Sequence, residues 1–212
     1  MKYEYLVFDL DGTISDPKNG IVKSLNYSLS AHGFATQDES ELCIFIGPPL
    51  DSAFKTITKS DDPDLISSLV SKYRERYSDV GFSENVLYDG IPQVLEQLSS
   101  IPHIKLGVCT SKRADFAERI LELFGLRHFF GFVNGGDVGI EKWQQLSSLL
   151  EQGDINKNSV MIGDRYVDIT AAQKNNLQSD GVLWGYGSHS ELSQLKPSHL
   201  LTSPCEIAGL AA

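Results

Sequence analysis

Cysteine and long apolar runs are scarce in this sequence of 212 residues. The three cysteines, Cys43, Cys109 and Cys205, are too few and too scattered for a disulfide framework or a zinc site. No apolar stretch approaches the ~20 residues that cross a bilayer. The apolar start, residues 3–8, is followed at once by two aspartates, which the core of a signal peptide would not tolerate. These absences predict a soluble protein of the reduced cytoplasm.

Positive charge is also in short supply. Lysine and arginine number 18 against 28 aspartates and glutamates, so the formal net charge is −10. An acidic surface is repelled by nucleic-acid phosphates and by anionic lipid, so we expect neither nucleic acid nor a membrane as a partner. The hydrophobic fraction of 41% is ordinary for a globular chain, and the length suits one large domain or two modest ones.

Short apolar segments alternate with helical patterns through most of the chain. The segments that we interpret as strands are residues 3–8, 104–109, 129–133, 160–162 and 182–184. Between them, apolar residues recur at helical spacing, as in Phe116, Ile120, Leu121 and Phe124. This alternation predicts an α/β fold with a doubly wound parallel sheet, a Rossmann-like core with helices on both faces.

One long stretch breaks the alternation. From residue 19 to residue 77 the apolar spacing is helical throughout, and Gly47-Pro48-Pro49 marks a turn within it. We interpret this stretch as an all-helical insert placed after the first strand. The resulting division assigns residues 1–16 and 86–212 to the α/β core and residues 17–85 to the insert.

Polar residues follow several of the predicted strands, and open α/β sheets bind ligands beyond the carboxyl ends of their strands. These residues are Asp9, Asp11 and Gly12 after the first strand, Thr110 and Ser111 after the second, Lys142 further on, and Asp164 and Asp168 after the fourth. Carboxylates suit a hard divalent cation, whereas a hydroxyl and an ammonium group suit a phosphate. Gly12 lets the backbone bend and present N–H groups to an anion.

Each of these residues also has a purely structural interpretation. Asp-Gly is a common turn dipeptide, Thr110 suits a helix N-cap, and Lys142 alone suits a solvated helix start. Asp164 and Asp168 suit a turn residue and an N-cap. A shared chemical role is favoured over these separate structural roles, because otherwise chance would have placed all of these residues, in order, after consecutive strand-like segments.

The same residues resemble the signatures of a known family. Asp9-Leu10-Asp11-Gly12-Thr13 is similar to the first signature of the haloacid dehalogenase-like hydrolases. The residues that match the second, third and fourth signatures, in the right order, are Thr110, Lys142 and the pair Asp164 and Asp168. The helical insert resembles the cap of that family. Residues 46–50 and 181–187 resemble its phosphoglycolate phosphatase-like branch.

The resemblance implies a Mg²⁺-dependent phosphatase. Asp9 would be the nucleophile that forms an aspartyl-phosphate. Asp11 would protonate the leaving oxygen and afterwards activate water. Mg²⁺ would be held by Asp9, the main-chain carbonyl of Asp11, and Asp164.

The other matched residues are implied to act on the phosphoryl group. Those that would bind its oxygens are Gly12, Thr110, Ser111 and Lys142. Backbone amides near Leu10 and Ser111 would assist them. Asp168 would not bind the metal directly, but would order either Lys142 or the water molecules around the metal.

The substrate stays open at this point. A helical cap over a small site suits a small phosphorylated metabolite, and the branch resemblance favours phosphoglycolate. The alternatives are a 5'-nucleotidase or broad-specificity phosphatase, then a β-phosphoglucomutase-like phosphomutase, and last a catalytically inactive binding protein. A metal-free haloacid dehalogenase has no need of Asp11, which favours phosphate chemistry. The cap residues considered for the substrate are Lys18, Asn19, Lys23 and Lys55. Monomer and homodimer are both open.

Overall fold

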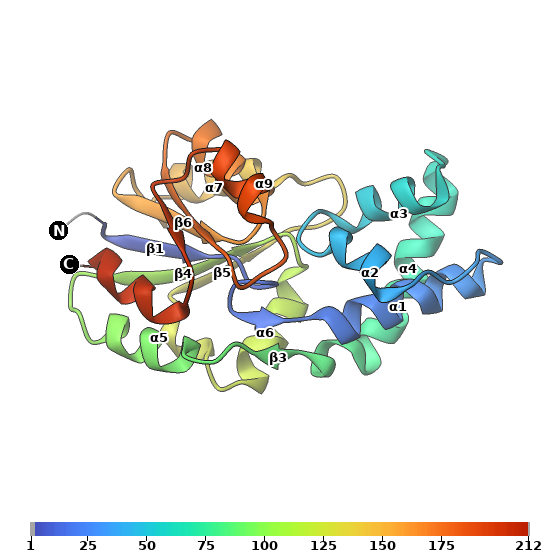
Figure 1. Ribbon diagram of the computed structural model, residues 1–212, viewed down its shortest axis with the longest axis horizontal. Coiled ribbons are helices and arrows are strands. Elements are labelled where there is room, and N and C mark those ends of the chain that lie inside the picture. Colours follow the sequence, from blue (N-terminus) through green and yellow to red (C-terminus); the bar gives the residue numbers. More distant parts are fainter. Residues whose placement is uncertain (1–2, 212) are drawn as a thin grey trace.

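The computed structural model describes residues 3–211, and within them the core of the fold is a six-stranded sheet. The strands are β1 (Tyr5–Phe8), β4 (Lys105–Thr110), β5 (Phe132–Gly135), β6 (Ser159–Gly163), β7 (Gln178–Val182) and β8 (His199–Leu201). Their order is β5-β4-β1-β6-β7-β8, and each neighbouring pair is parallel. The chain therefore winds outward from β1 on both sides, which confirms the predicted doubly wound α/β fold (Figure 1).

Strand positions differ from the sequence prediction at the later strands. β7 begins at Gln178, four residues before the predicted segment, and ends at Val182. Before Val182 its residues are polar or glycine, so no apolar run marks the strand, although Ser179 and Asp180 are buried. β8 is absent from the prediction because it has three residues at the edge of the sheet.

Alternating residues of the central strands pack on opposite faces of the sheet. In β1, Leu6 and Phe8 join the larger core cluster, whereas Val7 joins the cluster on the other face. β6 repeats this pattern, with Met161 on the same side as Val7. This period of two fixes which side chains face each helical layer.

Helices cover both faces of the sheet (Figure 1). The elements on the face of the larger cluster are α5 (Ile91–Ser99), α6 (Ala114–Leu123), η3 (Arg127–Phe129) and η4 (Pro204–Ala211). The elements on the opposite face are α7 (Lys142–Gln152) and α8 (Tyr166–Lys174), with α9 (His189–Gln194) beside α8. Among residues 3–211, no helix has both the length and the apolar composition that a membrane crossing requires.

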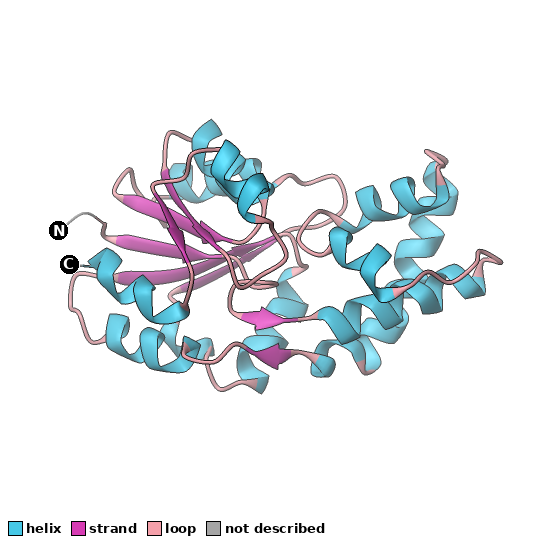
Figure 2. Ribbon diagram, viewed as in Figure 1, coloured by secondary structure: helices cyan, strands magenta, loops and turns pink. Residues whose placement is uncertain are grey.

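The insert is helical and has its own hydrophobic cluster, which includes Leu25, Phe54 and Leu69. Its elements are α1 (Lys18–Ala31), α2 (Glu39–Leu42), η1 (Cys43–Phe45), α3 (Leu50–Thr58), α4 (Pro63–Asp79) and η2 (Gly81–Glu84). Figure 2 shows these helices beside the sheet, beyond one end of its strands. We call them the cap from here on.

Two short strands join the cap to the core. β2 (Ser15–Asp16) and β3 (Val86–Leu87) pair antiparallel where the chain enters and leaves the cap. The predicted boundaries, after residue 16 and before residue 86, coincide with the end of β2 and the start of β3. The division into two domains itself stays a prediction.

Candidate active site

The sequence-predicted residues lie where the central strands end beneath the cap. Asp9 follows β1, Thr110 is the last residue of β4, and Asp164 follows β6. The N–H of Asp9 donates to the carbonyl of Ile162 at 2.8 Å, so the sheet ladder itself fixes the backbone of Asp9. Neighbouring parallel strands thereby bring residues far apart in sequence to one edge of the sheet (Figure 1).

Lys142, the first residue of α7, is buried between two carboxylates. Its Nζ lies 3.0 Å from Asp9 Oδ2 and 2.5 Å from Asp168 Oδ1, and the three side chains are at most 1% exposed. Burial alone would lower the pKa of Lys142, but the two carboxylates outweigh burial and raise it above its ordinary value. Both carboxylates therefore favour the charged form of Lys142 and contact its ammonium group from two sides.

Asp168 makes its closest contact with Lys142. Its second oxygen, Oδ2, accepts a hydrogen bond from the N–H of Arg165 at 2.9 Å. Burial raises the pKa of Asp168 to about 6, and Lys142 partly offsets that effect. With both oxygens engaged, Asp168 lies where a group that orients the lysine would be placed.

A group of acidic oxygens surrounds the end of β6. Asp9, Asp164 and Asp168 each offer an oxygen, and these oxygens lie within 4.8 Å of one another. Asp164 accepts from the N–H of Tyr186 at 2.7 Å and from Thr13 Oγ1 at 3.5 Å. Burial raises the pKa of Asp164 well above its ordinary value, and the nearby Asp168 and Asp9 add to the increase.

This arrangement fits a divalent cation. Counted as fully ionised, the four buried carboxyl groups of Asp9, Asp11, Asp164 and Asp168 carry two more charges than the ammonium groups of Lys112 and Lys142 balance. Buried charges without a counterion are costly, and carboxylate oxygens are the ligands that hard divalent cations prefer.

Asp11 is held by a lysine that the sequence analysis did not single out. Lys112 Nζ lies 2.9 Å from Asp11 Oδ2, while Asp11 Oδ1 is buried and has no hydrogen-bond partner within residues 3–211. Burial raises the pKa of Asp11, and the charge of Lys112 partly offsets the increase. The position of Lys112, two residues after Thr110, is the sequence signal that could have found it.

Gly12 makes a tight turn against Asp164. Its φ is +81°, and a Cβ at this position would lie 2.1 Å from Asp164 Oδ2, so a side chain would displace that carboxylate. The N–H of Gly12 donates to the carbonyl of Ser15 at 2.8 Å. The lack of a side chain at Gly12 thus lets the turn lie close against Asp164. The N–H of Gly12 already donates within the turn, so this geometry gives no support to the predicted contact between Gly12 and phosphate.

A cavity lies between the cap and the strand ends. Its polar floor includes Asp9, Asp11, Thr110 and Ser111. The apolar and aromatic residues in its walls are Ile21, Leu25, Phe45, Pro48, Leu50, Ala53, Tyr73, Tyr77 and Phe116. This cavity is where a substrate would meet the predicted nucleophile.

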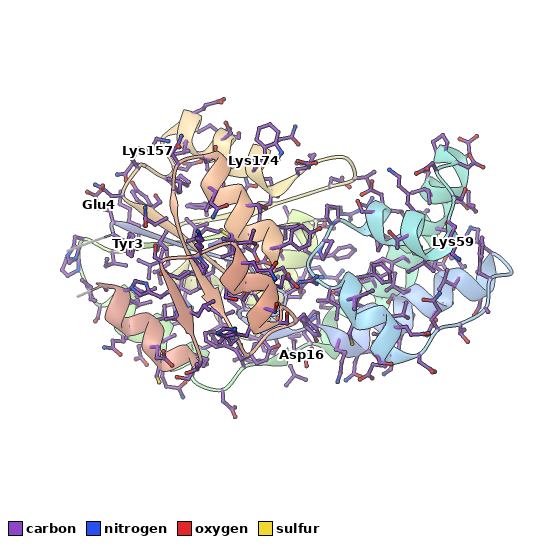
Figure 3. The ribbon with its side chains drawn as sticks, turned by 45° about the horizontal axis from the view of Figure 1, so that its top comes forward. Tyr3, Glu4, Asp16, Lys59, Lys157 and Lys174 are labelled. Carbon is purple, nitrogen blue, oxygen red and sulfur yellow. The ribbon has the colours of Figure 1, made fainter. Side chains whose placement is uncertain are left out.

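The four cap residues considered for the substrate do not line this cavity. Lys18, Lys23 and Lys55 are instead paired with cap carboxylates, at 2.9, 2.8 and 3.4 Å respectively, and Asn19 is exposed. Helical spacing shows which residues share a face but not which face lies over the core. Figure 3 marks Asp16, which lies where the cap begins.

Comparison with known proteins gives the family. A family model described as haloacid dehalogenase-like hydrolase matches residues 6–182. The chain belongs to the haloacid dehalogenase-like hydrolases. It is 36% identical over 203 residues to a 5'-nucleotidase from Pseudomonas aeruginosa, covering 94% of this chain and 91% of that protein.

Two further relatives place this hydrolase within the family. It is 31% identical to a phosphoglycolate phosphatase from Agrobacterium fabrum, covering 85% of this chain and 80% of the relative. The crystal structure of a predicted phosphatase from Clostridium acetobutylicum matches with a TM-score of 0.93 and 34% identity, covering 100% and 99% of the two chains. This hydrolase is therefore a phosphoric monoester hydrolase of the phosphoglycolate phosphatase-like branch.

Arg165 has a structural role in this hydrolase. Its guanidinium donates to the carbonyls of Ile44, at 3.0 Å, and Ile46 in the cap, and pairs with Glu191 at 3.1 Å. Arg165 directly follows Asp164, so the loop that carries the acidic residues also fastens the cap. Cys109 is buried and burial raises its pKa to about 12, so this thiol is no nucleophile at neutral pH.

Proposed function

We propose that this hydrolase uses Mg²⁺ and an aspartyl-phosphate on Asp9 to hydrolyse a small phosphomonoester. The observation that carries the proposal is a buried group of Asp9, Asp164 and Lys142, of which Asp9, together with Asp11, lines the cavity. A nucleophile, a cation-binding set and a fixed ammonium group meet there within a few ångströms.

Mg²⁺ would be held by the side chains of Asp9 and Asp164, with the main-chain carbonyl of Asp11 as the family resemblance implies. When bound, it neutralises charge on the phosphate so that a carboxylate can approach. Asp168 is assigned to Lys142 because its Oδ1 lies nearer to Lys142 Nζ, at 2.5 Å, than Asp9 Oδ2 does, at 3.0 Å, and its Oδ2 accepts from the N–H of Arg165.

The remaining steps belong to the residues of the chain. Asp9 attacks phosphorus, and the bond from phosphorus to the ester oxygen breaks as that oxygen takes a proton from Asp11. Lys142 and the hydroxyls of Thr110 and Ser111 bind the phosphoryl oxygens. Asp11, now deprotonated, then takes a proton from the water that hydrolyses the aspartyl-phosphate, which restores both groups.

The lining of the cavity favours an ester with an apolar or aromatic body. The positively charged side chains that line the cavity are Arg74, Lys112 and Arg113. Each already has a carboxylate partner: Asp137 at 2.5 Å, Asp11 at 2.9 Å and Asp115 at 2.5 Å, respectively. A carboxylate such as that of phosphoglycolate would need one of these cations, because burying an unpaired charge is costly. We therefore propose a nucleoside monophosphate ahead of phosphoglycolate, as in the relative from Pseudomonas aeruginosa.

The chemistry is tested with p-nitrophenyl phosphate. We expect release of p-nitrophenol with Mg²⁺, none with EDTA, and none from Asp9→Asn. Asp154→Asn, which changes an exposed aspartate, is the matched control and should retain full activity. Turnover that persists in Asp9→Asn or in EDTA would contradict the mechanism, as would failure of beryllofluoride, a mimic of the aspartyl-phosphate, to bind with Mg²⁺.

Substrate preference is tested with AMP and 2-phosphoglycolate at saturating Mg²⁺. We expect a higher kcat/KM for AMP, because its base can lie against the apolar wall. A higher value for 2-phosphoglycolate would contradict the proposed substrate class and leave the reaction mechanism untouched.

All three cysteines are free, which supports the reduced cytoplasm as the proposed compartment.

A further inference from the structure

Lys112 lies outside the signature residues, yet it holds one oxygen of the candidate acid. It belongs to the loop between β4 and α6, and its side chain is 7% exposed. Its Nζ lies 2.9 Å from Asp11 Oδ2, and Asp11 Oδ1 has no hydrogen-bond partner among the described residues. Both residues line the cavity. One oxygen of Asp11 is therefore fixed, and the other is left for a ligand.

The same ammonium group is held by the cap. Lys112 Nζ donates to Tyr77 Oη at 2.7 Å and lies 4.3 Å from the centre of the Tyr77 ring. Tyr77, in the last turn of α4, is 1% exposed, stacks on Tyr73 at 5.3 Å and meets the edge of Phe116 at 5.1 Å. Lys112 thus connects a carboxylate of the core to a rigidly packed hydroxyl of the cap.

A polar network continues from Tyr77 to the junction of cap and core. Asn85 Nδ2 lies 3.4 Å from Tyr77 Oη, and Asn85 Oδ1 accepts from Ser15 Oγ at 3.0 Å. Ser15 belongs to β2 and Asn85 directly precedes β3, so the network reaches both crossings of the chain. A shift of the cap against the core would move Tyr77 away from Lys112.

We propose that Lys112 and Tyr77 are positioning residues that hold Asp11 for proton transfer to the leaving group when the cap lies against the core. The inference rests on the proposed phosphatase function. A general acid acts when it is within hydrogen-bonding reach of the oxygen it protonates, so an unanchored Asp11 carboxyl group spends less time in the productive orientation. Lys112 and Tyr77 therefore affect proton transfer without contacting the phosphoryl group.

The test is the dependence of kcat/KM on the leaving group. A series of substituted phenyl phosphates, from p-nitrophenyl to phenyl, keeps the aromatic ring and the phosphate charge of the ester while making the leaving group poorer. An ester with a good leaving group departs with little help, whereas phenol departs slowly unless it is protonated. If Asp11 is no longer held in position, kcat/KM should therefore fall selectively for esters with poor leaving groups. Partial unfolding of the enzyme would instead lower kcat/KM by the same factor for every ester.

We expect Tyr77→Phe and Lys112→Met to steepen this dependence. In both variants kcat/KM for phenyl phosphate should fall by about tenfold or more, within the about 10²–10⁴-fold range of general acid catalysis, while p-nitrophenyl phosphate changes little. Lys112→Arg keeps a cation that can reach both partners and should recover part of the loss. Tyr27→Phe and Lys72→Met, which alter partners of the exposed Glu75, are the matched controls and should match the wild type.

Two results would overturn the inference while the wild type remains active. An unchanged leaving-group dependence in both variants would show that Lys112 and Tyr77 serve packing alone. A loss in Lys112→Met confined to 2-phosphoglycolate would make Lys112 a substrate ligand instead. A wild type without Mg²⁺-dependent turnover of any ester would overturn the proposed function, and this inference with it.

Discussion

Lys142 shows how one buried side chain can decide the electrostatics of a site. It lies between Asp9 and Asp168 with 1% of its side chain exposed. Removing one partner of a buried ion pair leaves the other charge uncompensated, and that cost exceeds the net value of the pair itself. Lys142 is therefore important for stability as well as for the proposed chemistry.

Lys142→Met should destabilise the fold and abolish turnover. With EDTA at neutral pH, we expect the free energy of unfolding to fall by about 3–5 kcal/mol, because Asp9 and Asp168 lose their common partner. Urea unfolding followed by circular dichroism measures the change. Lys174→Met, at an exposed lysine paired at 3.6 Å with Glu141, is the control and should stay within about 0.5 kcal/mol of the wild type. Equal stabilities of the two variants would contradict this account.

At the scale of elements, the loop after β7 supports the acidic residues. Trp184 Nε1 donates to the carbonyl of Thr13 at 3.0 Å, and the N–H of Tyr186 donates to Asp164. A Cβ at Gly185 would lie 2.3 Å from the carbonyl oxygen of Gly12 and 2.4 Å from Asp164 Cβ. The loop and the first turn thus enclose Asp164 from two sides, which explains Gly185 and also Gly187, whose added Cβ would lie 1.9 Å from the carbonyl oxygen of Asp164.

Gly185→Ala should therefore impair Mg²⁺-dependent activity. The added methyl group meets backbone on one side and Asp164 on the other, so the carboxylate must move. A displacement of about 1 Å in such a site costs on the order of 10²-fold in rate, and we expect a loss of kcat/KM of that order. Steady-state kinetics with p-nitrophenyl phosphate measure it. Gly209→Ala is the control, because nothing lies within 4 Å of its added Cβ; a similar loss there would refute the explanation.

At the scale of the whole molecule, the buried excess of negative charge links cation binding to folding. The strand ends that hold Asp9, Asp11 and Asp164 belong to the central strands of the sheet, so repulsion among them acts on the core itself. A ligand that binds the folded state alone stabilises it by mass action. Mg²⁺ should consequently affect the stability of the entire chain.

We expect Mg²⁺ to raise Tm, and Asp164→Asn to abolish this rise. At a concentration about 100 times Kd, binding adds about 2.7 kcal/mol to the free energy of unfolding. With EDTA, Asp164→Asn should unfold at a temperature equal to or above that of the wild type, because burial penalises the ionised carboxylate. Thermal unfolding with and without Mg²⁺ measures both effects. A wild-type Tm that does not respond to Mg²⁺ would contradict the proposed metal site.

Much of the active site follows from the order of residues along the chain. Parallel strands place their carboxyl ends at one edge of the sheet, so the residues after β1, β4 and β6 had to meet once the alternation of strands and helices was recognised. The placement of Asp9, Thr110 and Asp164 was predictable for this reason. The roles assigned to them stay predictions until the variants are measured.

The cap could be recognised from the sequence, but its contacts could not. Helical spacing distinguishes the apolar face of a helix from the polar one, and it says nothing about how the helix is turned over a neighbouring domain. Lys18 and Lys23 were therefore among the residues considered for the substrate, whereas Tyr73 and Tyr77 were not. In the structure, the lysines pair with glutamates of the cap, and the tyrosines line the cavity.

What the sequence determined by itself is the fold class, the family and the set of chemical groups, because local periodicity and short signatures carry that information. Tertiary structure decided the partners: Lys112 on Asp11, Lys142 between Asp9 and Asp168, and the glycines against Asp164. Such partners depend on distances of a few ångströms between segments far apart in the chain. Those distances are set by the packing of the whole molecule, and no local pattern encodes them.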